Sequence, residues 1–353
     1  MTEIMKPFIS VLIPTYNRVS LVVEAVGSAL AQDYSGLEVI VVDDGSTDDT
    51  TSRLALIRDK RFRYVSKTNS GVAATRNRAI VEAQGDYIVW LDSDDILLPH
   101  AVSTFVSVIA NNPGVDILYG HLIVTDRKGN ETGRLISKDY RANALIQELV
   151  YSSVIQHAGT CVRKQCYACV GGYDPQLKYA EDYDFFSRAA DVCVFKSIPD
   201  FLCLYRQHGP QLCGYSNTRD KSLECEVVLR MVARYGFKRL FPDLFSINTE
   251  AAGTASFFRL VRVFNERRSG QETMKAFRVA MSAIRNAGKL DELVLSEVKN
   301  FLYEVAVSDC GEYRYYAWSC LRSMPGDMVG WKHVLFSLFP NSIRGAVFRM
   351  RDR

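Results

Sequence analysis

The sequence predicts an α/β fold in which a parallel, helix-covered sheet is followed by an α-helical C-terminal region. Through about residue 110, short apolar runs alternate with segments of helical periodicity, which is the pattern of βα units. Two of these runs end abruptly in carboxylates. Ligands of such sheets bind at this place, outside the carboxyl ends of the strands. Past about residue 217, one helical pattern follows another. We therefore predict a domain of residues 1–217 and a helical region of residues 218–353.

The elements of the first domain follow from apolar runs and turn residues. Ser20 is expected to cap the first helix, whose predicted inner face carries Leu21, Ala25, Ser28 and Ala29. Asp48 or Asp49 is expected to cap the second. Strands are predicted over residues 8–13, 37–42, 63–66, 86–91, 116–125 and 202–208, and helices over residues 20–32, 50–58, 71–84 and 181–190. The turn at residues 126–130 predicts a hairpin that leads out of the first half of the domain.

Composition and charge bound the classes of protein that fit. With 353 residues, 48% hydrophobic and 24% charged, the composition is globular. A net charge of +3 is too small to indicate nucleic-acid binding. No apolar run approaches the roughly 18 residues of a membrane span, and the N-terminus lacks the apolar core of a signal peptide. Nine cysteines without a disulfide framework predict reduced thiols, so a cytoplasmic protein is expected.

The strand predicted at residues 86–91 is followed by three carboxylates, Asp92, Asp94 and Asp95. In extended backbone Asp92 and Asp94 point to the same side, where two like charges require a cation. Mn²⁺ or Mg²⁺ prefers oxygen ligands and often binds substrate phosphates, so we predict a metal-bound phosphorylated ligand. The alternative is a solvated acidic loop. Neither G-x-G-x-x-G nor G-x-x-x-x-G-K-[ST] follows any of these strands, which argues against dinucleotide oxidoreductases and P-loop NTPases.

Four stretches, at residues 11–18, 41–48, 69–77 and 90–95, resemble the successive motifs of family 2 glycosyltransferases. The resemblance covers roughly residues 7 to 210. It implies the A-type glycosyltransferase fold, with a Rossmann-like nucleotide-binding sheet and an acceptor-binding half. It also implies a divalent metal and transfer of a sugar, with inversion, from a nucleotide-sugar donor, for which a UDP-sugar is our first choice.

The resemblance implies roles for individual residues of these motifs. Tyr16 would lie against the nucleobase, Asp44 would accept from a base N–H, and Arg76 would help to hold the nucleotide. Asp92 would contact the ribose or the metal, and Asp94 would be the principal metal ligand. The remaining motif residues assigned to donor binding are Pro14, Asn17, Arg18, Asn69 and Ser93.

The residues alone leave alternatives open at each of these positions. Tyr16 is equally explained by loop packing, and Asp44 by a turn in which it bonds its own backbone. Arg76 and Arg78 are also explained as the solvated face of a helix.

Residues 181–186 resemble the Glu-Asp motif of the same family, whose Asp would deprotonate the acceptor hydroxyl. We assign that role to Asp182 and expect Glu181 to orient the acceptor or support Asp182. The alternative is that these acids, with Asp184, only occupy the first turn of a helix, where the dipole favours them. His208 ends the last predicted strand and is a candidate metal ligand, or an ordinary loop histidine.

A zinc site at Cys166-x-x-Cys169 is disfavoured, because no second Cys/His pair follows at finger-like spacing. Near the C-terminus an apolar helical stripe is followed, beyond Pro340, by arginines. This tail, residues 331–353, either lies on an anionic membrane surface or docks on its own protein. Similar tails occur in bacterial relatives that build surface polysaccharides, which supports the membrane reading by analogy only.

The sequence therefore predicts an inverting glycosyltransferase acting on a glycan or lipid-linked acceptor in bacterial surface polysaccharide or glycoconjugate synthesis. One alternative is a phosphohydrolase of the haloacid dehalogenase type with Asp92 as nucleophile, although Asp95-Ile96 after Asp94 departs from that family's pattern. The other is a non-catalytic nucleotide-sugar-binding protein.

Overall fold

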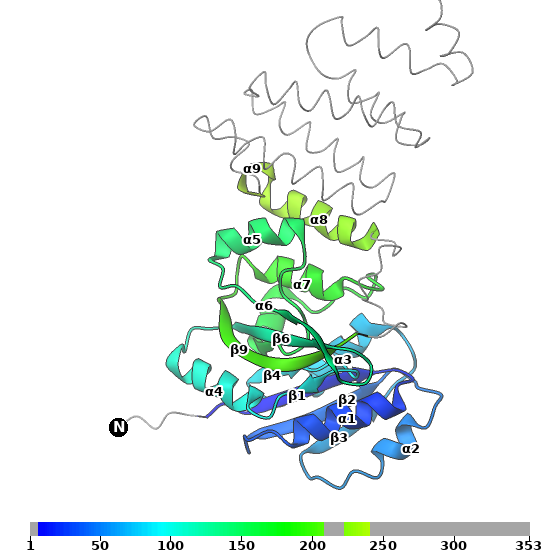
Figure 1. The fold of residues 1–353 in the computed structure, drawn as a ribbon. Helices are drawn as coiled ribbons and strands as arrows, with labels where there is room; N and C mark the ends of the chain where they lie inside the picture. The colour runs from blue at the N-terminus through cyan, green and yellow to red at the C-terminus, as the bar shows by residue number, and fades with distance from the viewer. Residues whose placement is uncertain (1–5, 208–221, 241–353) are drawn as a thin grey trace, which may run out of the picture. The chain divides into compact units, whose positions relative to one another are not determined.

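The computed structural model describes residues 6–207 and 222–240 of the chain (Figure 1). The chain divides into two compact units, Met1–Arg219 and Asp220–Arg353. In the second unit the described part comprises α8 (Ser222–Tyr235) and α9 (Phe237–Leu240). His208 and the predicted C-terminal tail lie outside the described residues. Within the described part, no helix is both long and apolar enough to cross a membrane.

The first unit is built on one mixed sheet, which has nine strands within the described residues. The strands are β1 (Ile9–Thr15), β2 (Leu37–Asp43), β3 (Phe62–Ser66), β4 (Tyr87–Trp90), β5 (Ile96–Leu97), β6 (Ile117–Thr125), β7 (Glu131–Leu135), β8 (Cys161–Arg163) and β9 (Phe195–Arg206). Their order is β3-β2-β1-β4-β8-β6-β9-β5, and β7 pairs with β6. The first four neighbours are parallel, as predicted, whereas β8 is antiparallel to both β4 and β6.

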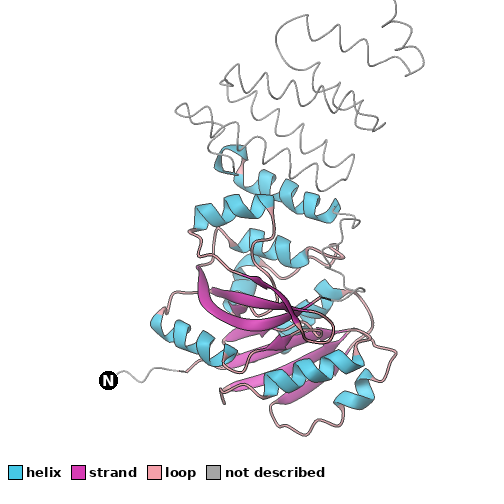
Figure 2. Ribbon diagram, viewed as in Figure 1, coloured by secondary structure: helices cyan, strands magenta, loops and turns pink. Residues whose placement is uncertain are grey.

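Helices lie on either side of the sheet (Figure 2). They are α1 (Val19–Leu30), α2 (Thr50–Leu54), α3 (Val72–Glu82), α4 (Ala101–Asn111), α5 (Ala142–Tyr151), α6 (Gln165–Val170) and α7 (Glu181–Ala189). Every residue of β1 and β2 is buried, as expected for parallel strands covered on both faces. The α/β fold is thus confirmed, and so is the hairpin, which β6 and β7 form.

The start of α1 differs from the sequence-based expectation. The helix begins at Val19, so Ser20 lies inside its first turn instead of capping it. The carboxylate of Asp48 accepts the Val19 N–H at 3.1 Å and also bonds the N–H and hydroxyl of Thr50, at 3.1 and 2.6 Å. One side chain therefore serves the first turns of both α1 and α2. The buried face of α1 also differs, and consists of Val22, Ala25, Val26 and Ala29.

Gly85 marks a close approach between the turn before β4 and strand β1. A Cβ atom at this position would lie 2.6 Å from the Ser10 nitrogen and 2.8 Å from the Phe8 oxygen, both of them backbone atoms. We expect Gly85→Ala to lower the free energy of unfolding by about 2 kcal/mol, because overpacking against backbone forces a shift. Urea denaturation measures this. Gly114→Ala is the matched control, since an added Cβ there meets nothing within 4 Å. Equal stabilities of the two variants would contradict the prediction.

Candidate active site

The loops that follow β1, β2 and β4 meet at the carboxyl edge of the parallel strands. Ion pairs link the side chains they carry: Arg18, after β1, pairs with Asp94, after β4. Arg76 of α3 pairs with Asp92 and also with Glu181, the first residue of α7. The structure therefore brings together the predicted nucleotide-side and acceptor-side residues, although 105 positions separate Arg76 from Glu181.

Arg76 is the centre of this cluster. Its guanidinium is buried, with Nη2 at 2.9 Å from Oδ1 of Asp92 and Nη1 bonded to Oε1 of Glu181. The alternative of a solvated helix face is therefore wrong for Arg76. It holds for Arg78, which is exposed and pairs with Glu82 along the helix at 2.7 Å. A buried arginine joined to two carboxylates sets their relative positions, because its guanidinium would otherwise be an unpaired buried charge.

Aromatic rings lie against the Arg76 guanidinium. Its Cζ lies 5.7 Å from the ring centroid of Tyr173 and 6.0 Å from that of Trp90, within cation–π range. Trp90 Nε1 donates to the Tyr167 hydroxyl at 2.7 Å, and the Tyr173 hydroxyl lies 2.8 Å from Nε2 of His157. Burial and the Arg76 charge hold the pKa of His157 well below its usual value, so the ring is neutral. Sequence reasoning missed Tyr167 and His157, because no local pattern marks these partners.

Asp182 and Glu181 open α7 in different environments. Glu181 is buried, and this burial raises the pKa of its carboxyl to about 7 despite the opposing charge of Arg76. Asp182 is half-buried and accepts the Tyr183 N–H at 2.8 Å. The preceding residue, Ala180, has a left-handed φ of 63°, a conformation that costs free energy for any residue with a Cβ. The entry to α7 is thus strained at the position that presents both acids.

The shifted pKa of Glu181 predicts a pH-dependent stability. Below about pH 4.5 the carboxyl is protonated in both states, and above about pH 7 it is ionised in both. In between, the folded chain holds a proton that the unfolded chain releases, so the carboxyl's contribution to stability falls as pH rises. We therefore expect the free energy of unfolding of Glu181→Gln to rise relative to wild type across this window, as measured by urea denaturation at several pH values.

The control for this experiment is Glu131→Gln. Glu131 is exposed, and its hydrogen bond with Arg134 lowers the pKa of its carboxyl. In the folded chain Glu131 therefore titrates below the window. The difference in free energy of unfolding between Glu131→Gln and wild type should stay constant above about pH 4.5. If the free energy of unfolding of Glu181→Gln relative to wild type also stays constant with pH, the raised pKa of Glu181 is contradicted.

For Asp44 the sequence left two roles open, contact with the donor or a hydrogen bond within its own turn. In the structure the turn hydrogen bonds are made by Asp43. The Asp44 carboxylate accepts the backbone N–H groups of Ser70 and Gly71, each at 2.9 Å, and pairs with Lys67. It therefore fastens the loop before α3 and does not bond its own turn. The turn residue is Asp43, whose Oδ1 accepts the N–H and the hydroxyl of Ser46 at 2.9 and 2.6 Å.

The other residues assigned to donor binding differ in exposure. Tyr16 is 46% exposed and follows the end of β1, so its ring is available to a ligand. Asn17 joins the first two loops, since its Oδ1 accepts the Thr47 N–H at 2.7 Å while its own N–H donates to the Ser46 hydroxyl at 2.8 Å. Asn69 is exposed, whereas Pro14 and Ser93 are buried at the ends of their strands. Their roles in binding stay predictions.

The carboxylates after β4 do not lie on extended backbone as expected. The Asp95 N–H donates to the Asp92 carbonyl at 3.0 Å, so the chain turns here, and Arg76 and Arg18 pair with Asp92 and Asp94. Even so, the donor set fits a divalent cation. Burial and the charge of Asp94 raise the pKa of Asp92, and Oδ2 of Asp95 is buried with no hydrogen-bond partner among the described residues. Carboxylate oxygens are the ligands that Mn²⁺ or Mg²⁺ prefers, although Asp92, Asp94 and Asp95 do not all lie within 4.8 Å of one another in this structure.

The mixed sheet and the position of the carboxylates at its edge agree with the A-type glycosyltransferase fold that the sequence predicts. Residues 10–167 match the model of the family described as glycosyl transferase family 2, so this part of the chain is similar to that family. It is 32% identical over 236 residues to chondroitin synthase from Escherichia coli, covering 66% of this chain and 34% of that protein. Hyaluronan synthase from Pasteurella multocida is 32% identical over 194 residues, or 54% of this chain and 20% of that one. The chain thus spans about a third or less of the length of these two curated relatives.

Solved structures show the same fold. TarS 1-349 from S. aureus superposes with a TM-score of 0.55 and 19% identity, covering 90% of this chain and 93% of that one. The same protein in complex with UDP-GlcNAc gives a TM-score of 0.51 at 18% identity, covering 79% and 90%. The family model describes glycosyltransferases, and the two curated relatives are synthases of chondroitin and hyaluronan. The comparisons therefore give no support to a phosphohydrolase or to a non-catalytic nucleotide-sugar-binding protein.

Proposed function

We propose that the protein is an inverting glycosyltransferase that moves a sugar from a nucleoside-diphosphate donor to a hydroxyl of a glycan or lipid-linked acceptor. The observation that carries this proposal is the Arg76 bridge, which ties Asp92 on the donor side to Glu181 beside Asp182 on the acceptor side. The match of residues 10–167 to the family model supports the same reaction class. A binding protein would not require a carboxylate such as Asp182 beside the donor site.

In the proposed reaction Asp182 is the general base. Its carboxylate takes the proton of the acceptor hydroxyl while the hydroxyl oxygen attacks C1 of the sugar from the face opposite the diphosphate. The bond between C1 and the diphosphate oxygen breaks, the nucleoside diphosphate leaves, and the anomeric configuration inverts. Arg76 and Glu181 are positioning residues, because they set the first turn of α7 against Asp92. Asp92 and Asp94 would hold a divalent cation, which supplies positive charge to the leaving diphosphate when bound.

The donor is proposed to bind over the loops after β1 and β2. The exposed Tyr16 ring offers a stacking surface for a base, and Asp44 lies on the neighbouring strand end. A uridine donor is the first choice, which agrees with the UDP-GlcNAc bound to TarS. Mn²⁺ or Mg²⁺ is the proposed cation, and His208, outside the described residues, remains a candidate ligand.

The proposed setting is bacterial surface polysaccharide or glycoconjugate synthesis in the cytoplasm. Support comes from relatives that are named as synthases of chondroitin and hyaluronan. The basic amphipathic tail at residues 331–353 is proposed to bring the enzyme to an anionic membrane surface and a lipid-linked acceptor. This tail lies outside the described residues.

Calorimetric titration of the full chain with a panel of nucleoside diphosphates and their sugars tests the proposal. Each titration is made with Mn²⁺ present and again after chelation. We expect one base to bind in a metal-dependent manner, followed by release of its nucleoside diphosphate when an acceptor is added. Failure of every nucleotide to bind, together with catalysed release of phosphate from simple phosphate esters, would establish the phosphohydrolase instead.

A further inference from the structure

A second cluster of metal-binding side chains lies away from the candidate active site. It comprises Asp116, just before β6, Cys166 of α6, and Cys193, between α7 and β9, and we call it the sulfur cluster. One ligand atom from each lies within 4.8 Å of the other two. Within the described ranges, no other group of three or more such side chains meets this condition. The grouping therefore joins three segments that are distant in sequence.

The sulfur cluster is at the sheet edge opposite to the candidate active site. Strand β8 runs antiparallel to both β4 and β6, so β4 and β6 run in the same direction. Asp92 follows the end of β4, whereas Asp116 precedes the start of β6. A ligand bound at Asp116 would therefore act on the structure and not on the reacting atoms.

The two cysteines form a thiol pair suited to metal binding. Cys166 is 4% exposed and Cys193 is 9% exposed. The hydrogen bond between the two thiols lowers the pKa of Cys193 and raises that of Cys166. The two sulfurs are therefore buried in contact with each other, which is the geometric requirement for binding one ion together.

Outer contacts hold the Asp116 carboxylate in place. Its Oδ2 accepts the Val194 N–H at 3.0 Å, and its Oδ1 pairs with Nε of Arg163 at 3.0 Å. Metal-binding carboxylates typically have such partners, which orient them toward the ion. Its side chain is also 24% exposed, so an ion can enter from solvent.

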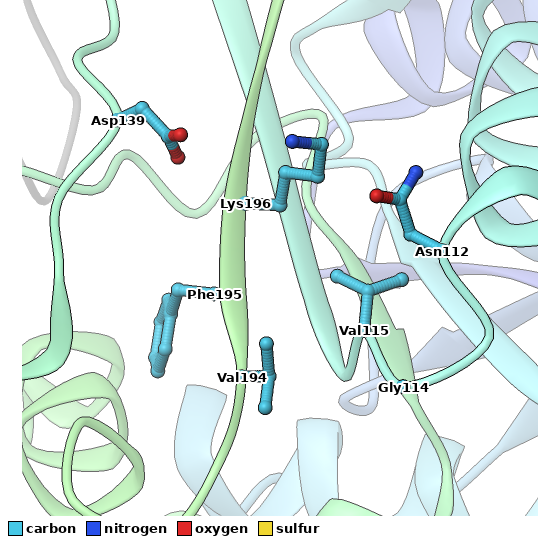
Figure 3. Close-up of a pocket in the computed structure, with 7 residues that line it drawn as sticks. All are labelled: Asn112, Gly114, Val115, Asp139, Val194, Phe195 and Lys196. Carbon is cyan, nitrogen blue, oxygen red and sulfur yellow. The ribbon is translucent and has the colours of Figure 1, made fainter.

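A cavity is lined by sequence neighbours of Asp116 and Cys193 (Figure 3). Its volume is about 440 Å³, and its lining includes Val115 and Val194, the sequence neighbours of Asp116 and Cys193. The N–H groups of Asp116 and Ile117 both donate to the Val194 carbonyl, which keeps the two segments side by side. The cavity thus borders the two segments that carry Asp116 and Cys193, while its lining includes none of the three side chains of the cluster.

We propose that Cys166, Cys193 and Asp116 bind a zinc ion, with water in the fourth position. Two sulfurs and one carboxylate oxygen are a zinc donor set, whereas Mg²⁺ and Ca²⁺ take oxygen ligands. Each thiol releases a proton to solvent as its sulfur bonds to the ion, so no oxidant or reductant is needed. The charges also balance, because two thiolates and a carboxylate face Zn²⁺ and the Arg163 guanidinium.

This site differs from the Cys166-x-x-Cys169 pair that the sequence suggested and disfavoured. Cys169 is exposed and takes no part in the sulfur cluster. The partner of Cys166 is instead Cys193, 27 positions farther along the chain. No spacing motif reveals such a pair, because its members come together only when α6 meets the segment between α7 and β9.

The test compares zinc bound by untagged full-length protein with zinc bound by the double variant Cys166→Ser/Cys193→Ser. The protein is dialysed against zinc and then against buffer, and elemental analysis gives the zinc content. We expect the double variant to lose a zinc ion that wild type retains, and its affinity to fall by more than about 100-fold. Cys169→Ser is the matched control, with the same change on the same helix, and should retain that ion.

Cobalt substitution in the intact wild-type chain provides a readout that does not depend on how the variants fold. Co²⁺ should give a sulfur-to-cobalt charge-transfer band, absent from the double variant and present in Cys169→Ser. Asp116→Asn should weaken zinc binding while keeping the band. The proposal is overturned if wild type and the double variant retain equal zinc, or if intact mass shows a Cys166–Cys193 disulfide in protein without zinc.

Discussion

Replacing Asp182 by asparagine is expected to lower kcat by about 10²- to 10⁴-fold, the range typical for loss of a general base. Asparagine keeps the shape of the side chain and its acceptor oxygen for the Tyr183 N–H, but it cannot take the proton of a sugar hydroxyl. Because the donor is proposed to bind at the loops after β1, β2 and β4, its affinity should change little. Steady-state kinetics with release of nucleoside diphosphate measures kcat, and calorimetry measures donor affinity.

Asp184→Asn separates a catalytic effect from a structural one on the same helix. Asp184 is buried and pairs with Arg188 at 2.8 Å, so its replacement should lower the free energy of unfolding while folded protein keeps its kcat. If Asp182→Asn retains wild-type turnover, the base must be a different group. If both variants lose kcat equally, the loss reflects damage to α7.

The second large effect is expected for Asp94→Asn. Removing one charged oxygen ligand should weaken metal-dependent donor binding by at least about 100-fold, since outer-shell changes alone cost 10- to 100-fold at metal sites. The change also leaves Arg18 without its carboxylate partner, which adds positive charge near the donor diphosphate. Donor binding without metal should therefore persist, so the ratio of affinities with Mn²⁺ and with chelator is the informative quantity.

Asp49→Asn is the control for this experiment. Asp49 is an exposed acid on the loop after β2, and its side chain makes no capping hydrogen bond to α2. Asp49→Asn removes the same charge from the same edge of the sheet. An equal loss of metal-dependent donor affinity in this variant would therefore indicate a general electrostatic effect. An undiminished Mn²⁺ dependence in Asp94→Asn would remove Asp94 from the metal site.

Most of the parallel half of the sheet could be predicted, because a strand buried on both faces leaves a continuous apolar run in the sequence. The residues 131–160 were harder. This stretch carries α5, whose four buried residues, Leu145, Ile146, Leu149 and Val150, cover fewer than two helical turns, and it lacks sharp turn signals. Strand β8 has three residues and is held by its pairing with β4 and β6, so local sequence alone could not indicate it.

The sequence by itself determined where the first four strands lie along the chain and which two of them end in acids, since apolar period and turn chemistry act over a few neighbouring residues. Only the tertiary structure decided what those acids contact. It placed Arg76 between Asp92 and Glu181, turned the chain at Asp92, and set Cys166 against Cys193. Such contacts join residues far apart in the chain, and the burial that makes them strong arises only when the whole unit packs.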